Sequence, residues 1–91
     1  MNEVYNFLKS ECKLPEYDNG IGYPFSISAY KDSYDGKIVG IEISLESEIY
    51  YISKRKKYFA IYRMTVVGER PKIRKTLESL KRFILFSILN D

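Results

Sequence analysis

The sequence contains no histidine, tryptophan or glutamine, and it has a single cysteine, Cys12. Without histidine, a general base acting near neutral pH must be a carboxyl, amine, phenol or thiol group with a shifted pKa. One cysteine without histidine cannot form a closed zinc site, nor can one cysteine form a disulfide within the chain. We therefore expect no metal site, no cofactor and no catalytic residue set. Since small proteins without disulfides are typical of reducing compartments, we also expect an intracellular, cytoplasmic location.

Long apolar segments are missing as well. The longest apolar run, Phe83 to Leu89, is interrupted by Ser87 and is too short to span a bilayer. The first residues show no basic segment followed by an apolar stretch, so no signal peptide is predicted. The five glycines are scattered and form no phosphate-binding loop. The sequence thus predicts no membrane partner and no nucleotide-binding loop.

A chain of 91 residues predicts one domain, residues 1–91, with a thin hydrophobic core that makes a homodimer plausible. The net charge of +3 permits anionic partners without requiring them. Abundant isoleucine, tyrosine and lysine with few amide side chains fit a heat-adapted source, although an AT-rich genome would produce a similar bias. This composition is also common among proteins of viruses and mobile elements in thermophilic archaea.

The hydrophobic pattern predicts an α+β fold in which a helix, a four-stranded antiparallel meander and a long C-terminal helix follow one another. The first helix is expected over residues 2–14, with Asn2 as its cap and Pro15 as its stop. The last helix is expected from Pro71 to about Asn90. Its buried line has helical spacing and comprises Ile73, Leu77, Leu80, Ile84 and Ile88.

Two stretches of alternating residues, Tyr23 to Lys31 and Lys37 to Glu46, predict the first hairpin. A three-residue loop at Tyr34–Gly36 would pair Ile27 with Ile43 and put the apolar residues of both strands on one face. The helices are expected to cover the face that carries Phe25, Ile27, Ile41, Ile43, Ile52 and Phe59.

The stretch from Ile49 to Val67 predicts a second hairpin with aromatic and β-branched arms. A four-residue tip, Lys54 to Lys57, would pair Ser53 with Tyr58 and set Ile52 opposite Phe59. Tyr51 and Tyr62 then point to the other side. Because neither side of this hairpin is polar, both sides are expected to be at least partly covered.

The basic tip and the tyrosines near it favour a non-enzymatic protein that binds nucleic acid. Adjacent cations can contact phosphates, and aromatic side chains beside them can stack bases. The candidate residues are Lys54, Arg55, Lys56, Lys57, Tyr51, Tyr58 and Tyr62, with Tyr30 extending the set. The competing interpretation is a solvated turn beside tyrosines that serve the core or an interface.

The alternative function is that of a protein-binding accessory or inhibitor protein, whose partner would be another copy or a host protein. The second half of the C-terminal helix is apolar on all sides, which indicates a contact beyond one sheet face. The predicted dimer or partner interface comprises Ile49, Phe83, Phe86 and Leu89.

An RNase is the third hypothesis. The segment Lys57-Tyr-Phe-Ala-Ile-Tyr-Arg63 resembles a core strand of the RelE-type ribosome-dependent RNase toxins. The resemblance implies catalysis by arginine, lysine and tyrosine side chains, without a required histidine. It covers seven residues, and that family leads with its helices, whereas the long helix predicted here is C-terminal. The sequence is therefore not assigned to that family.

Overall fold

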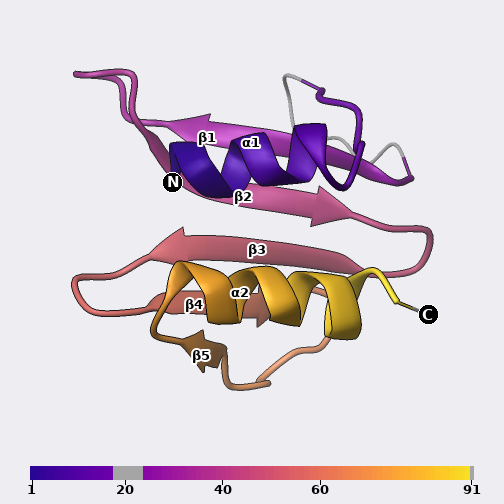
Figure 1. Ribbon diagram of the computed structural model, residues 1–91. Helices are drawn as coiled ribbons and strands as arrows, with labels where there is room; N and C mark the ends of the chain where they lie inside the picture. The colour runs from indigo at the N-terminus through magenta and orange to yellow at the C-terminus, as the bar shows by residue number, and fades with distance from the viewer. Residues whose placement is uncertain (18–23, 91) are drawn as a thin grey trace.

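Two helical segments lie on one face of a five-stranded antiparallel sheet in the computed structural model, which describes residues 1–17 and 24–90 (Figure 1). The predicted α+β class and the antiparallel meander are confirmed, with strand order β1-β2-β3-β4-β5. The elements in chain order are α1 (Asn2–Ser10), β1 (Ser26–Lys31), β2 (Ile38–Ser44), β3 (Ile49–Lys54), β4 (Phe59–Arg63), β5 (Lys72–Arg74), α2 (Leu77–Phe83) and the π-helical turn η1 (Ile84–Ile88).

The fifth strand replaces the predicted start of the C-terminal helix. Residues 72–74 pair with β4, with Ile73 opposite Ala60, so Ile73 belongs to the sheet. The helix instead begins after Thr76, whose hydroxyl accepts a hydrogen bond from the Ser79 amide at 3.1 Å. Helical spacing alone could not separate the two outcomes, because Ile73 also fits an alternating Lys-Ile-Arg strand. The hydroxyl cap satisfies an amide that the first helical turn leaves unpaired.

The first helix is shorter than predicted, because it ends at Ser10 and has Met1 rather than Asn2 as its cap. Beyond it, the chain turns back and residues 15–17 run beside β1, with a parallel bridge between Glu16 and Ile27. This segment covers the outer edge of β1 at Ile27. The predicted strand start at Tyr23 and the turn residues before it, 18–22, lie outside the described residues.

The first hairpin has the predicted register, with Ile27 opposite Ile43 and Ala29 opposite Ile41. Its loop is longer than predicted, since the Asp32 amide donates to the Lys37 carbonyl at 2.8 Å and closes the turn there. The register shifts after Tyr30, which leaves Val39 as an extra residue and restores the predicted alternation. Gly36 has a φ of +71°, the left-handed backbone expected of it.

The second hairpin differs from the prediction by two residues. Ser53 lies opposite Ala60, and Ile52 lies opposite Ile61. The Arg55 amide donates to the Tyr58 carbonyl at 2.8 Å, so the turn is tighter than the predicted four-residue tip. A shift of two residues keeps every side chain on its predicted face, because side chains alternate with a period of two. The predicted partners were therefore wrong and the predicted faces right.

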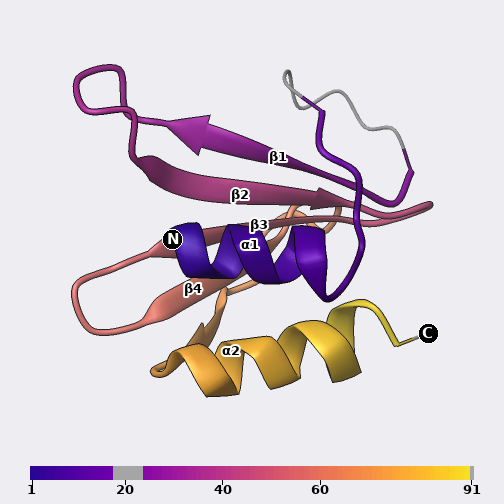
Figure 2. The ribbon, with the colours of Figure 1, turned by 45° about the horizontal axis from the view of Figure 1, so that its top comes forward.

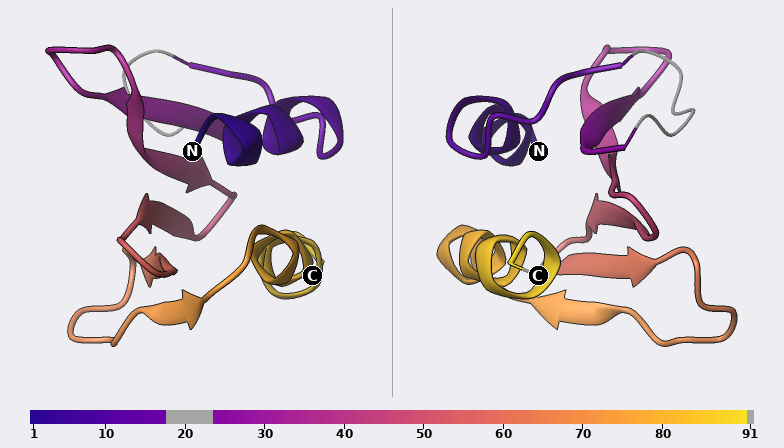
Figure 3. Two further views of the ribbon diagram at one scale, coloured as in Figure 1. Left: turned by 60° about the vertical axis from the view of Figure 1, so that its left-hand side comes forward. Right: turned by 90° about the vertical axis from the view of Figure 1, so that its right-hand side faces the viewer.

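Both helices cover the same face of the sheet, as the two views of Figure 3 show. In Figure 1, α1 lies over β1 and β2 while α2 lies over the β3–β4 half. Figure 2 shows both helices on the same side of the strands. The predicted core face is correct except for Phe25, which is 53% exposed, has a φ of +59° and precedes β1. The most deeply buried residues of the two layers include Val4, Leu8, Ile27, Ile41, Ile43, Ile52, Leu80, Ile84 and Ile88.

The opposite face of the sheet carries no helix or strand from residues 1–17 and 24–90. Within those residues, no helix has the length and apolar character needed to cross a membrane. Part of this open face is still covered by the chain, since Ser28 is buried and its hydroxyl donates to the Tyr17 carbonyl at 2.7 Å. The face carries Tyr30, Tyr51, Tyr58 and Tyr62, the tyrosines singled out in the sequence.

Candidate nucleic-acid interface

Three tyrosines form a row across the open face of the sheet. Tyr51 on β3 lies opposite Tyr62 on β4 in the strand register, and their ring centroids are 6.4 Å apart. Tyr30 on β1 packs edge-on against Tyr51, with centroids 5.6 Å apart and an interplanar angle of 69°. The row thus joins strands that are not all neighbours, and β2 passes beneath it.

Gly40 on β2 provides the room for this arrangement. It lies between Tyr30 and Ser53 in the register. A Cβ atom on Gly40 would overlap the hydroxyl and the ring of Tyr51. The Tyr51 ring therefore rests against the β2 backbone, where a side chain would otherwise stand. One side of the ring is covered by the sheet, and the half-buried side chain presents its remaining surface outward.

Hydrogen bonds fix the two ends of the row. At the first end, the Tyr30 hydroxyl donates to Glu42 at 2.9 Å, and this bond is the main cause that raises the pKa of Tyr30. At the other end, Arg55 donates to the Tyr62 hydroxyl at 3.1 Å, which raises the pKa of Arg55. The face is therefore anionic beside Tyr30 and cationic beside Tyr62.

The predicted basic tip divides between the two faces. Arg55 lies on the open face, where it bonds the Tyr62 hydroxyl and pairs through its backbone amide with the Tyr58 carbonyl. Lys54 crosses to the helix side, with its ammonium group 4.6 Å from the centroid of the Phe59 ring. Lys56 and Lys57 are exposed in the turn. We call Tyr30, Tyr51, Tyr58, Tyr62 and Arg55 the tyrosine face.

Ser53 adds a polar group next to the row. Its side chain is 7% exposed, and its hydroxyl has no hydrogen-bond partner among the residues that the structure describes. It lies between Gly40 and Ala60, whose small size leaves the hydroxyl without a neighbouring side-chain acceptor. A buried hydroxyl without a hydrogen bond costs free energy, so Ser53 is a locally unfavourable group in the sheet beside the row.

The four residues of the predicted partner interface differ in how much of each side chain is exposed. Phe83 and Leu89 pack against the core of their own chain, and the Arg74 guanidinium carbon lies 4.5 Å from the centroid of the Phe83 ring. Ile49 is half-buried in β3, opposite Ser44 of β2. Phe86 alone keeps a large exposed area, at 66%. Much of the apolar surface expected to need a partner is thus used within the chain.

Two members of the site escaped the sequence analysis. In the alternating pattern of β2, Gly40 occupies a position that points away from the core. A glycine at such a position indicates that another group lies close to the strand backbone. Glu42, on the same strand, was not among the predicted site residues. The covering of Gly40 by Tyr51 depends on the pairing of β2 with β3, which single-strand patterns do not encode.

Within residues 1–17 and 24–90, no three acidic or cysteine side chains come together in a way that could hold a metal ion. The chemistry available on the tyrosine face is therefore that of aromatic rings, hydroxyl groups and one guanidinium group. Comparisons of this chain with protein-family models, with curated proteins and with solved structures found no match.

Proposed function

We propose that this protein is a non-enzymatic module that binds single-stranded nucleic acid on the tyrosine face. The observation that carries the proposal is the row of tyrosine rings on an open sheet face, with a guanidinium group at one end. Exposed aromatic rings on a sheet stack unpaired bases, and every base offers a face for stacking. Neighbouring cations contact the phosphates and make the affinity dependent on salt.

The charges of the face give the bound strand a preferred path. Glu42 is held at the Tyr30 end, where its carboxylate repels phosphates. Arg55, Lys56 and Lys57 lie at the β3–β4 turn, next to Tyr62. We therefore expect the phosphates to follow the turn side of the row while bases lie on Tyr51 and Tyr62.

Salt dependence tests this proposal. Each contacted phosphate of a single strand contributes a slope of about −0.7 in a plot of log affinity against log salt. Three cations at the turn then predict an affinity loss of about 20-fold between roughly 50 and 200 mM salt. We expect fluorescence anisotropy with a labelled single-stranded oligonucleotide to show this dependence. A triple change to alanine at Arg55, Lys56 and Lys57 should remove most of it.

A matched control removes the same charge elsewhere. Lys31, Lys75 and Arg82 are exposed and lie outside the tyrosine face, so changing all three to alanine should leave most of the affinity intact. Equal weakening by the two triple variants would mean that only net charge matters, and the proposed site would then be wrong. Preference for duplex over single-stranded oligonucleotides would also contradict base stacking.

A second proposal, for protein binding, rests on Phe86 and commits to another copy of this chain as the partner. Phe86 is 66% exposed and its neighbour Leu85 is 41% exposed, both on η1. An isologous contact of the two helical segments would bury both side chains. We expect light scattering at high protein concentration to give the mass of a dimer, and the change Phe86→Glu to restore the monomer. A monomeric wild-type chain would exclude this second proposal.

A further inference from the structure

A cavity of about 340 Å³ lies on the helix side of the sheet, beside the Tyr50–Arg63 pair at the end of the β3–β4 ladder opposite to the turn. Ile61 of β4 and Phe83 of α2 give it an apolar interior, and the loop after β4 forms one wall. The cavity shares no residue with the tyrosine face.

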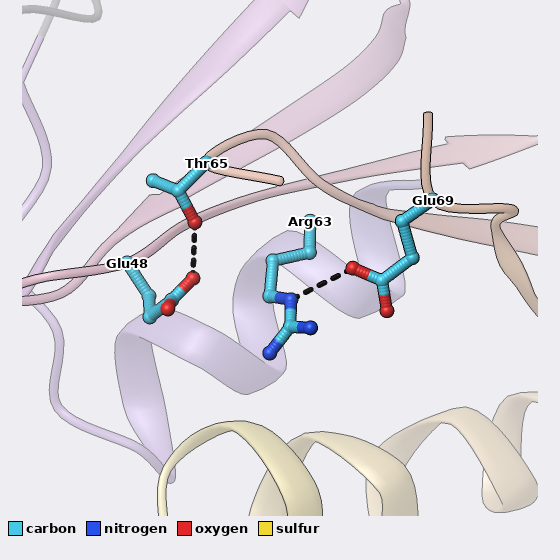
Figure 4. Close-up of polar contacts among 4 residues, drawn as sticks. All are labelled: Glu48, Arg63, Thr65 and Glu69. Carbon is cyan, nitrogen blue, oxygen red and sulfur yellow. Dashed lines mark hydrogen bonds and ion pairs between the residues drawn. The ribbon is translucent and has the colours of Figure 1, made fainter. Parts of the chain in front are cut away.

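Cations dominate the polar lining. Arg63, Arg70 and Lys72 contribute three positive charges, and Glu69 contributes one negative charge, which leaves two positive charges at the cavity. Arg63 donates from Nε to Glu69 at 2.8 Å, as Figure 4 shows, so the single carboxylate is already engaged. Among the residues that the structure describes, the side chains of Arg70 and Lys72 have no ion-pair or hydrogen-bonding partner.

The wall that carries these cations is held in place by its own contacts. Thr65, in the β4–β5 loop, donates to Glu48 in the β2–β3 connection. The Arg63–Glu69 pair links the end of β4 to the later part of the β4–β5 loop (Figure 4). Glu48 is thereby occupied outside the cavity. The carboxylates near the loop thus position its backbone, while the cations of Arg70 and Lys72 stay available to a ligand.

The apolar part of the cavity is also preset. The guanidinium of Arg74 lies over the Phe83 ring, which keeps that ring in place beside Ile61.

The two positive charges of the cavity match the charge of a phosphate monoester, which is about −1.5 to −2 at neutral pH, better than they match the charge of a carboxylate. Arginine forks also fit phosphate oxygens in pairs.

From this combination we propose that the cavity binds a small phosphate monoester whose compact apolar or aromatic body contacts Phe83 and Ile61. Arg70 and Lys72 bind the phosphate oxygens, and the terminal nitrogens of Arg63 assist them. The volume of about 340 Å³ is at the small end of ligand pockets, which fits a single compact molecule. This site is independent of nucleic-acid binding on the other face.

Isothermal titration calorimetry with phenyl phosphate, at fixed ionic strength, tests this inference. We expect saturable binding that is stronger than the binding of benzoate or of inorganic phosphate. The double change Arg70→Ala and Lys72→Ala should weaken it by about tenfold to 100-fold, since charged hydrogen bonds are lost. Lys75→Ala combined with Arg82→Ala, outside the cavity, should leave it unchanged.

A variant that keeps every charge provides a second test. Ser87 lines the cavity from η1 and is exposed, so Ser87→Phe should fill the entrance without disturbing the core, and it should prevent phenyl phosphate from binding. Absence of saturation at millimolar phenyl phosphate would overturn the inference. Equal affinity for benzoate, or unchanged binding by the Arg70/Lys72 variant, would do the same.

Discussion

Replacing both Tyr51 and Tyr62 by alanine is expected to weaken single-stranded nucleic-acid binding by at least about 30-fold. Each base–aromatic stack contributes roughly 1–3 kcal/mol, so two lost stacks remove roughly 2–6 kcal/mol of binding free energy. The two rings are cross-strand neighbours with centroids 6.4 Å apart, and the Tyr62 hydroxyl accepts a hydrogen bond from Arg55. Fluorescence anisotropy with the same labelled oligonucleotide measures the loss.

Three comparisons separate stacking from other causes. Tyr34→Ala removes a tyrosine that is 99% exposed in the first hairpin loop, and it should leave the affinity nearly unchanged. Phenylalanine at positions 51 and 62 keeps both rings and should retain most of the binding. Gly40→Ala forces the Tyr51 ring off the β2 backbone and should weaken binding although no contact residue is removed. Wild-type affinity in the double alanine variant would disprove a role for the tyrosine face.

Ile52→Ala is expected to lower the free energy of unfolding by about 2–5 kcal/mol. Ile52 is fully buried on β3, the central strand, between Ile41 and Ile61. Small domains are stable by only about 5–15 kcal/mol, so this loss is a large fraction of the total. Urea denaturation followed by circular dichroism should show a lower midpoint with a similar slope.

The size of the deleted group provides the internal control. Ile52→Val removes one methylene and should cost about 0.5–1.5 kcal/mol, whereas Val39→Ala on the exposed bulge should cost less than about 0.5 kcal/mol. If the Ile52→Ala variant unfolds at the same urea concentration as the wild type, the helices do not pack on this face as described.

The faces of the sheet could be predicted from the sequence because alternation with a period of two survives errors in pairing. Ile27, Ile41 and Ile43 were assigned to the core and are buried there. The partners in the second hairpin could not be predicted, since Lys54 to Lys57 contain no glycine, asparagine or aspartate to mark a turn. The register is fixed instead by the backbone hydrogen bond from the Arg55 amide to the Tyr58 carbonyl, which closes the turn.

The fifth strand and the cavity next to it could not be predicted from residue spacing along the chain. Ile73 satisfies the helical spacing of the C-terminal segment, and only the presence of β4 as a neighbour makes it a strand residue. The cavity combines Arg63 from a strand, Arg70 from a loop and Phe83 from a helix. These residues meet only when the strand, the loop and the helix pack together, so their spacing in the sequence does not predict the cavity.

The two edge strands, which are the margins of the sheet, affect how readily this protein aggregates in concentrated solution. One margin is β1, where residues 15–17 already bond the backbone of Ile27, so a foreign strand cannot pair with the start of this strand. The other is β5, three residues long, which follows Pro71 and carries Lys72 and Arg74. Like charges on a short margin repel a second copy. We therefore expect fibril growth by strand addition to be slow, even though the chain is rich in β-branched and aromatic residues.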